Sequence, residues 1–507
     1  MPNELTTRRD LAGRASTVKL PLPEIWVVMT LLVAYVGAPL GADAPILWAC
    51  LVLHYALIIA SVWKPSRVYR GLPTFVTAEF LFLFFAYLIY FLPYQLFLLD
   101  INDLEASQRF PGKAFSDQSN HAILLASIGM VSFRAGLRYL RPNSTLQRTN
   151  EHKRVTRLDA LSADSLALPV LALQILLIAF YLAFGFKAEA EGRYTDSTAG
   201  GNFAEGIYTG ITVLCMVAVA LILTPNRSRA AAAPKSIFLW AAAGVALLWA
   251  GRILLAGDRN SFLLIGIVAL GGIFTFRVRI GRWALVTCCA IALVMYNAIE
   301  QFRKGRVDSL MQYAFGEAAS GTASADSSFN ISTISVRAAL ANVPEYFDYG
   351  YGLYKLVGLA GVIPFIRGAV IPPEMPFTQS SDVLVMILLG PSATWGVGTN
   401  VIADIYMDFG LFGVPILLFL VGLGVAYTRV SLINHPDSPW RAVFYLVTLA
   451  LVAELPRYSL TFPVRPLVWV FLLFWAVAVL TPAIRQQHPS RGHHRRRAAQ
   501  QRHQAQI

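Results

Sequence analysis

"AGRILLAGDRNSFLLIG", residues 250–266, places Arg252, Asp258 and Arg259 inside an apolar run from Ile237 to Phe276. As one straight helix, this run of 40 residues would be about 60 Å long, whereas the hydrocarbon core of a bilayer is about 30 Å thick. The run must therefore turn once, and the polar letters "GDRNS" predict where it turns. Because an ionisable side chain at membrane depth is costly unless it faces a partner or a water-filled cavity, the charges at this turn indicate a function.

The composition of the whole chain agrees with a membrane protein. Of its 507 residues, 56% are hydrophobic and only 14% are charged, compared with about 25% charged in soluble proteins. The four cysteines all fall in apolar runs, which predicts neither a disulfide nor a thiolate metal site: Cys50, Cys215, Cys288 and Cys289. The net charge of +13 is better explained by topology signals than by nucleic acid, and we expect no nucleic-acid partner.

Apolar runs of membrane-spanning length predict an all-α polytopic integral membrane protein with about twelve transmembrane helices. The predicted spans lie near residues 25–41, 44–63, 74–98, 120–138, 165–184, 207–224, 237–256, 262–276, 283–299, 407–427, 441–456 and 467–483.

The distribution of charge predicts the orientation. With the N-terminus inside, the inner loops and tails hold 28 of the 42 basic residues but only 7 of the 29 acidic ones. The positive-inside rule therefore favours two cytoplasmic termini and places "GDRNS" at the outer surface. The predicted organisation is a cytoplasmic segment (1–24), nine spans (25–299), a large periplasmic loop (300–406), three spans (407–483) and a basic cytoplasmic tail (484–507) that is attracted to membrane lipids.

The large loop is the distinctive part of the outer side. A connection of this length is uncommon unless it is functional or disordered. It contains "YKLVGLAGVIPF" and "SDVLVMILLG", apolar segments too short to span a bilayer, which predict interfacial or re-entrant helices.

Charged residues gather at the outer ends of the spans with helical spacing. Arg252 and Arg259 are seven residues apart, two turns along one face if the helix continues to the turn, and Asp404 and Asp408 are separated by one turn. Further candidates on this side are Arg193, Glu300, Arg303, Arg306 and Arg457. Arginine outnumbers lysine on this side, and its planar guanidinium group can bind a phosphate through two hydrogen bonds. The carboxylates on the same side can act as general bases. The competing interpretation is a set of interfacial side chains and local salt bridges.

Several motifs are absent from the sequence. It contains no Gly-x-x-x-x-Gly-Lys-Ser/Thr phosphate-binding loop, and the outer side has no Asp-x-Asp pair, so we expect neither a nucleotide nor a metal, and no other cofactor. His54, central in the second span, is interpreted as a buried, hydrogen-bonded helix contact rather than a catalyst.

"GTNVIADIYMDFGLFGV", residues 398–414, resembles the closing motif of the oligosaccharide repeat-unit polymerases, the Wzy-type O-antigen and exopolysaccharide polymerases. In that family a Gly-rich approach precedes an acidic and aromatic helix start and a Phe-Gly-hydrophobic-Gly entry into a late span. The Gly-x-Arg-like "AGDRNSFLL", the loop arginine in "EGRYTDSTAGG" and the large outer loop also match, so the resemblance extends over about residues 185–425.

The resemblance implies a glycosyl transfer between two polyprenyl-pyrophosphate-linked oligosaccharides at the outer face of the bacterial inner membrane. A hydroxyl of the incoming repeat unit attacks the anomeric carbon of the growing chain, and polyprenyl pyrophosphate leaves. By this resemblance, pyrophosphate or glycan-phosphate contacts fall to Arg193, Arg252, Arg259, Arg303, Arg306 and Arg457, and base or sugar contacts to Glu300, Asp404 and Asp408. A chain-length regulator and a flippase are the implied protein partners.

Three alternatives remain. An O-antigen ligase shares the architecture but would need a histidine in its loop, and residues 301–406 contain none. A lipid-linked oligosaccharide flippase or transporter would line a midplane cavity with charges and often show repeated halves, whereas here the charges crowd one face. A non-catalytic scaffold is the third.

Overall fold

The computed structural model describes residues 17–18, 20–69, 72–104, 112–141, 156–186, 201–225, 235–256, 258–303, 328–363, 366, 377–393 and 396–481. The helices before the large loop are α2 (Leu22–Gly37), α3 (Ala44–Trp63), α4 (Ala78–Ala86), η2 (Tyr87–Phe91), α5 (Leu92–Leu98), η3 (Ser116–Gln118), α6 (Ser119–Tyr139), α7 (Arg157–Ala160), α8 (Ala163–Ala183), α9 (Gly201–Leu223), α10 (Ile237–Leu255), α11 (Arg259–Phe276) and α12 (Arg282–Arg303). Those that follow are α15 (Ser328–Asn342), α16 (Leu353–Ala360), α18 (Ser380–Leu388), α19 (Val401–Asn434), α20 (Pro439–Glu454), η6 (Leu455–Arg457) and α21 (Val464–Leu480).

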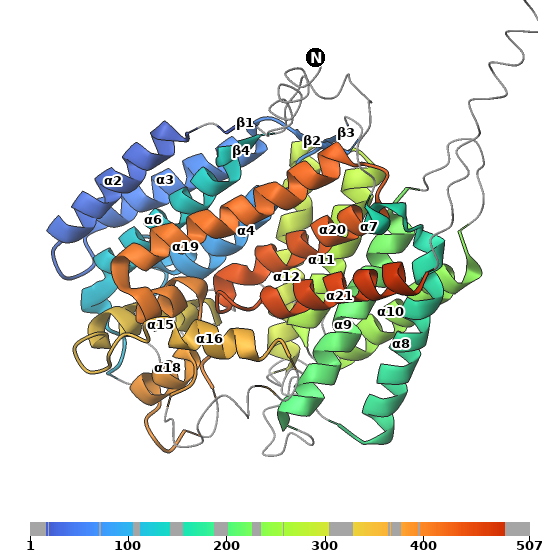
Figure 1. Ribbon diagram of the computed structural model, residues 1–507. Coiled ribbons are helices and arrows are strands. Elements are labelled where there is room, and N and C mark those ends of the chain that lie inside the picture. The colour runs from blue at the N-terminus through green and yellow to red at the C-terminus, as the bar shows by residue number, and fades with distance from the viewer. Residues whose placement is uncertain are drawn as a thin grey trace, which may run out of the picture.

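Two small antiparallel pairs are the strands of the described part of the chain. β1 (Thr17–Val18) pairs with β4 (Leu140–Arg141), and β2 (Ser66–Tyr69) pairs with β3 (Leu72–Thr74). Both pairs lie at the upper end of the molecule in Figure 1.

The all-α polytopic class is confirmed. Within the described ranges, nine helices are long and apolar enough to cross a membrane: Ala44–Trp63, Ala78–Leu98, Ser116–Tyr139, Ala163–Ala183, Phe203–Leu223, Ile237–Leu255, Arg259–Phe276, Val401–Asn434 and Pro439–Arg457. Three shorter apolar helices coincide with the predicted first, ninth and twelfth spans: Leu22–Gly37, Arg282–Val294 and Val464–Leu480. The number twelve and the orientation stay predictions.

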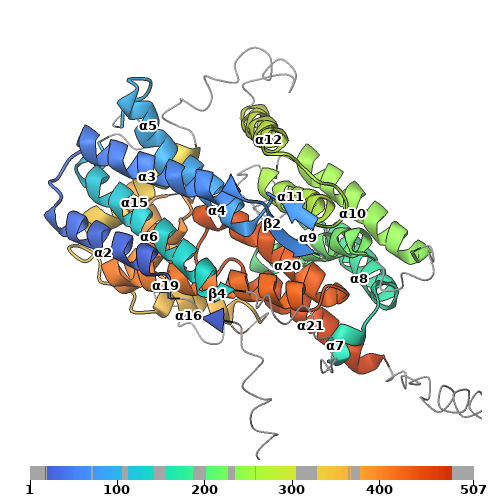
Figure 2. The ribbon, with the colours of Figure 1, turned by 90° about the horizontal axis from the view of Figure 1, so that it is seen from above.

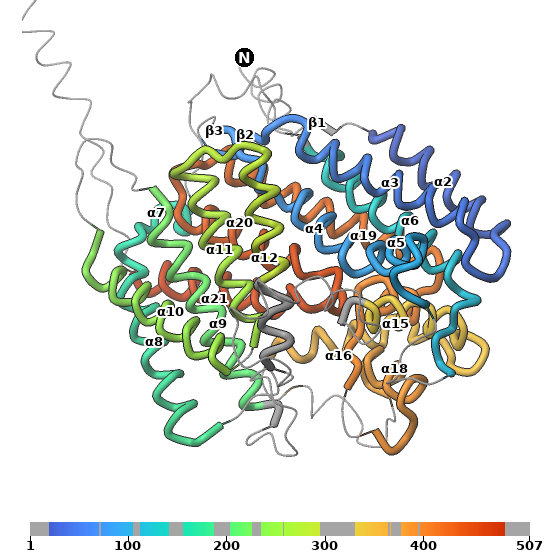
Figure 3. The backbone as a smooth tube through the Cα atoms, turned by 180° about the vertical axis from the view of Figure 1, so that it is seen from behind, coloured from blue at the N-terminus to red at the C-terminus, as the bar shows by residue number. Residues whose placement is uncertain are grey.

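The helices form two groups joined by α20. α6 packs against α2, α3 and α19, whereas α9 packs against α8, α10 and α11. α20 contacts α4 and α19 of the first group and α9 and α11 of the second. The view from above in Figure 2 shows α20 and α21 between the two groups. The back view in Figure 3 shows α12 beside α11.

α6 and α19 cross at very short range. A Cβ added at Gly136 of α6 would collide with the backbone carbonyl of Phe419, and one added at Gly422 of α19 would collide with that of Phe133. Glycine on both helices thus brings the two backbones into contact, as small residues do in many membrane bundles.

The predicted turn after Leu255 is confirmed. α10 ends at Leu255, α11 begins at Arg259, and Asp258 caps the new helix by accepting hydrogen bonds from the amides of Asn260 (3.0 Å) and Ser261 (3.3 Å). Since the first helix stops before the turn, Arg252 and Arg259 lie on different helices. The expectation that they share one helical face was therefore wrong, because it required α10 to continue to residue 259.

The large loop contains short helices where the sequence predicted apolar segments. The first part of "YKLVGLAGVIPF", up to Ala360, lies in α16, and "SDVLVMILLG" lies in α18 up to Leu388, and α15 precedes both. In Figure 1 these three helices lie together at the lower end of the bundle, opposite the strands. α16 and α18 pack against α19, and α15 packs against α18, α19 and α6. The loop helices are therefore part of the same packed body.

α19 begins earlier than the span predicted near residue 407. Asn400 caps it, because the side-chain oxygen accepts a hydrogen bond from the amide of Ala403 (2.9 Å). Asp404 and Asp408 thus lie inside the first part of the helix. The helix is kinked at Gly410, whose φ of 64° favours glycine.

Candidate functional site

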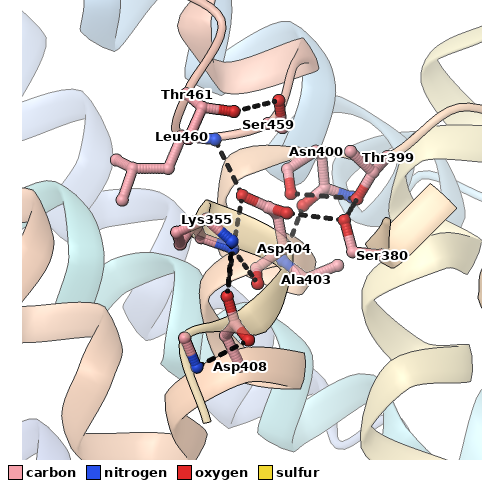
Figure 4. A network of polar contacts seen from close by, with 11 residues as sticks. Lys355, Ser380, Thr399, Asn400, Ala403, Asp404, Asp408, Ser459, Leu460 and Thr461 are labelled. Atoms are coloured by element: carbon pink, nitrogen blue, oxygen red, sulfur yellow. Dashed lines mark hydrogen bonds and ion pairs between the residues drawn. The ribbon is translucent and has the colours of Figure 1, made fainter. Parts of the chain in front are cut away.

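A buried lysine from the loop joins the two aspartates of α19. The ammonium of Lys355, on α16, lies 2.9 Å from Oδ2 of Asp404 and 3.0 Å from Oδ2 of Asp408. It also donates a hydrogen bond to the backbone carbonyl of Asp404 (2.9 Å). Figure 4 shows Lys355 between the two carboxylates. The spacing of one turn therefore places both aspartates on one face, as predicted.

The two carboxylates also accept hydrogen bonds from neighbouring segments. Asp404 accepts from the hydroxyl of Ser380 on α18 (2.5 Å) and from the amide of Leu460 (2.7 Å). Asp408 accepts from the amide of Gly352 (2.9 Å) and the amide of Lys355 (3.3 Å). Lys355 thus balances one of the two negative charges, and hydroxyl and amide donors stabilise the carboxylates further, so that these contacts hold α16, α18 and the 460 region against α19.

The chain that leads into α16 is shaped to fit this cluster. Gly352 caps α16 with a φ of 92°, and a Cβ at Gly350 would collide with Oδ1 of Asp408 and the ring of Tyr354. Burial, followed by the negative charge of Asp408, raises the pKa of Tyr354 to about 12, which keeps its phenol neutral at physiological pH. The cluster thus depends on glycine at the point of closest approach.

A second cluster surrounds the turn between α10 and α11. Tyr208 of α9 donates a hydrogen bond to Oδ2 of Asp258 (2.7 Å), while Oδ1 of Asp258 caps α11. Arg259 is buried at the start of α11. Arg457, at the end of η6, donates a hydrogen bond to Asn260 (2.7 Å), although the two residues are 197 positions apart in sequence. The structure therefore brings Arg259 and Arg457 to the same turn.

Arg252, in the last turn of α10, is held by two aromatic rings. Its guanidinium lies 4.8 Å from the ring centroid of Trp249 and 5.6 Å from that of Tyr181. Both rings contact the ring of Tyr208, which also binds Asp258. Arg252 is thus connected to the Asp258 turn through these rings, and cation–π attraction helps to hold its position.

The segment 455–461 links the two clusters. Its Leu460 amide binds Asp404 of the first cluster, and its Arg457 binds Asn260 of the second. Between these two, the Pro456 carbonyl accepts a hydrogen bond from Tyr90 of η2. At its end, Thr461 leaves no room for a Cβ at Gly358 of α16. A single short segment therefore sets the positions of both charged clusters.

The structure does not describe the side chains of several predicted site residues. Glu300 and Arg303 belong to the last turn of α12, but their side chains lie outside the described residues. Arg193 and Arg306 lie outside the described residues altogether, as does the basic tail from residue 484. The structure therefore describes side chains for Arg252, Arg259, Arg457, Asp404 and Asp408.

Two charged residues of this region, Lys355 and Arg465, were not singled out in the sequence, and a third, Glu454, stood there only as a carboxylate beside Arg457. Lys355 is the centre of the first cluster, and Arg465 packs on the ring of Trp469 (4.5 Å) and against Gly206 of α9. Glu454 ends α20 and is buried close to Arg457 and Arg259. The signal that could have revealed Lys355 and Arg465 is a lone charge in an otherwise apolar segment.

Two other sequence interpretations concern the interior. The side chain of His54 is buried, hydrogen-bonded to the carbonyl of Leu83 (3.0 Å) and stacked on Phe91, which confirms its role as a helix contact. The four cysteines are free thiols. In the described part of the chain, no three His, Cys, Asp or Glu residues are grouped so that they could hold a metal ion.

Over residues 25–484, the chain matches the family described as O-antigen polysaccharide polymerase Wzy. The chain belongs to this family. The resemblance found in the sequence is thereby confirmed. As a Wzy polymerase it is an enzyme that transfers glycosyl groups in polysaccharide biosynthesis, and the match favours this activity over the ligase and the flippase. Comparison with curated proteins and with solved structures found no match.

Proposed function

We propose that this Wzy polymerase joins polyprenyl-pyrophosphate-linked oligosaccharide repeat units at the outer face of the bacterial inner membrane. The hydroxyl of an incoming unit attacks the anomeric carbon of the growing chain, and the bond to polyprenyl pyrophosphate breaks. The departing pyrophosphate supplies the driving force, so the reaction needs neither a nucleotide nor a metal. A chain-length regulator and a flippase are proposed as protein partners.

The observation that carries this proposal is the arginine cluster at the turn before α11. Arg259 and Arg457 come from distant parts of the chain and lie close to the same turn. Arginines fixed before the reaction stabilise negative charge as it develops on a leaving pyrophosphate. Arg252 lies behind them, connected through Tyr208.

The remaining predicted residues keep their proposed roles around this centre. Arg193, Arg303 and Arg306 are proposed to contact pyrophosphate or glycan phosphate, and Glu300 is proposed as a base or sugar contact. Asp404 and Asp408 are proposed to act at the sugar side of the site, where their pairing with Lys355 also fixes the loop helices on α19.

Reconstitution with the lipid-linked repeat unit of the producing strain tests the proposal. We expect a ladder of polymer lengths without nucleotide or added metal. Arg259→Ala should abolish the ladder while the protein still inserts in the membrane, and Arg259→Lys should fail to restore it, because a single ammonium cannot replace a two-point phosphate contact. Arg67→Ala, which removes an exposed arginine of β2, is the matched control and should leave the ladder unchanged.

Each alternative outcome contradicts a different part of the proposal. Transfer of a single unit to lipid A would indicate a ligase, and lipid translocation without new glycosidic bonds would indicate a flippase. Normal chain growth by the Arg259→Lys variant would exclude a bidentate contact at this residue.

A further inference from the structure

The buried carboxylates of the described chain differ in their hydrogen bonds, and one of them stands apart. Six acidic side chains are buried there: Glu24, Asp159, Asp258, Asp404, Asp408 and Glu454. The first five accept hydrogen bonds from neighbouring groups. Neither oxygen of Glu454 has a hydrogen-bond partner among the described residues, although the side chain is only 3% exposed.

The buried carboxylates that accept hydrogen bonds have local structural roles. Asp258 caps α11, and Asp404 and Asp408 are paired with Lys355. The acceptor positions of these three side chains are therefore occupied by structural partners.

Glu454 has a different environment. It ends α20, immediately before η6, and the charged groups that act on its carboxylate are Arg457, Asp258 and Arg259. Arg457 directs a hydrogen bond to Asn260 rather than to Glu454. Glu454 thus lies beside the two arginines of the proposed pyrophosphate site with its lone pairs unused.

Such an arrangement is costly for folding. A buried carboxylate without hydrogen bonds loses several kcal/mol of hydration that nearby charges restore only in part. Buried groups of this kind are rare in natural proteins, and a catalytic role, in which a reacting group completes them, is one of the recognised reasons for keeping them. The open acceptor positions on Glu454 are therefore suited to a hydroxyl donor.

We propose that Glu454 is the catalytic base of the polymerase, an inference that rests on the function proposed above. Its carboxylate accepts the proton of the attacking sugar hydroxyl while that oxygen bonds to the anomeric carbon. The anomeric carbon–oxygen bond to the pyrophosphate breaks, and its electron pair leaves with the polyprenyl pyrophosphate, whose charge Arg259 and Arg457 stabilise. The protonated Glu454 then returns its proton to water before the next cycle.

The test compares Glu454→Gln with the wild type, with the lipid-linked repeat unit of the producing strain as substrate and released polyprenyl pyrophosphate as readout. Glutamine keeps the size of the side chain but cannot take the proton. We expect kcat to fall by about 100-fold or more with little change in KM, because the base acts in the transition state. The acid limb of the pH profile of kcat should disappear from the residual activity.

Two further variants keep the test decisive. Glu454→Asp retains a carboxylate one methylene shorter, so it should keep the acid limb while kcat falls less than in the glutamine variant. Glu345→Gln makes the same chemical change at an exposed position after α15 and should behave as the wild type. Size-exclusion profiles and thermal midpoints of all variants establish that the protein is folded.

Three results would overturn the inference. They are a kcat of Glu454→Gln within about threefold of the wild type, a loss expressed only in KM, and an unchanged acid limb. If Glu454→Gln fails to fold, an aspartate variant that folds but lacks the acid limb would overturn it equally. Absence of polymer from the wild type would instead refute the proposed function before any variant is compared.

Discussion

Lys355 illustrates what a single side chain does in this molecule. Its three donor positions are used by the carboxylates of Asp404 and Asp408 and by the carbonyl of Asp404. Spacing along the sequence was sufficient to place the two aspartates on one face, because they lie one helical turn apart. It was insufficient to pair Lys355 with them, because an ion pair between residues about fifty positions apart leaves no local pattern.

Replacing Lys355 by methionine should destabilise the protein strongly. The change removes the positive charge and leaves two buried carboxylates facing one another, for which a loss of about 3–5 kcal/mol is typical. We expect a lower thermal midpoint in detergent and loosened loop helices, measured by thermal unfolding and limited proteolysis. Lys64→Met, at an exposed lysine that follows α3, should have no such effect.

A second substitution checks the cause of that loss. Adding Asp408→Asn to Lys355→Met should recover part of the stability, since one of the uncompensated charges is removed. A Lys355→Met variant as stable as the wild type would show that the ion pairs do not hold the loop helices.

At the scale of elements, the sequence predicted helices well and their partners poorly. The apolar runs predicted the membrane-spanning helices, because in a bilayer the backbone N–H and C=O groups must form their hydrogen bonds within the helix. They gave no indication that α6 and α19, nearly three hundred residues apart, cross with their backbones in contact. That contact depends on Gly136 and Gly422. A side chain at either position would collide with the backbone of the other helix, and no local sequence pattern reveals this.

Gly422→Leu should separate α6 from α19 and lower stability, because its side chain would need the space of the Phe133 carbonyl. Gly424→Leu is a matched control two residues away, where a Cβ would meet nothing within 4 Å. We expect the first variant to show a clearly lower thermal midpoint and the second to match or exceed the wild type, since leucine favours helix over glycine. Equal midpoints for both would contradict close packing at this crossing.

At the scale of the whole molecule, the charged clusters and the strands occupy opposite ends. The loop helices lie at the lower end in Figure 1, and β2 and β3 lie at the upper end. The charge distribution in the sequence predicts that the lower end is periplasmic. The spatial separation of the two ends is consistent with that orientation, which remains a prediction.

Cysteine labelling can determine the orientation, because the native cysteines all lie within apolar helices. A membrane-impermeant maleimide should label Glu345→Cys in intact spheroplasts and Lys64→Cys only after lysis, since these exposed residues lie beside α15 and β2 respectively. The wild-type protein controls for background labelling. The reverse pattern would place the arginine cluster in the cytoplasm and contradict the proposed periplasmic reaction.

The segment 455–461 has a consequence for the order in which the protein is made. It carries Arg457 and the Leu460 amide, and Glu454 immediately precedes it, whereas Asn260 and Asp404 belong to helices synthesised earlier. Chains are made from the N-terminus, so both clusters stay incomplete until the hairpin of α20 and α21 has entered the membrane. A nascent chain that stops before residue 439 would hold most of the bundle but neither cluster in complete form, so under the proposed function activity is the last property that this polymerase acquires.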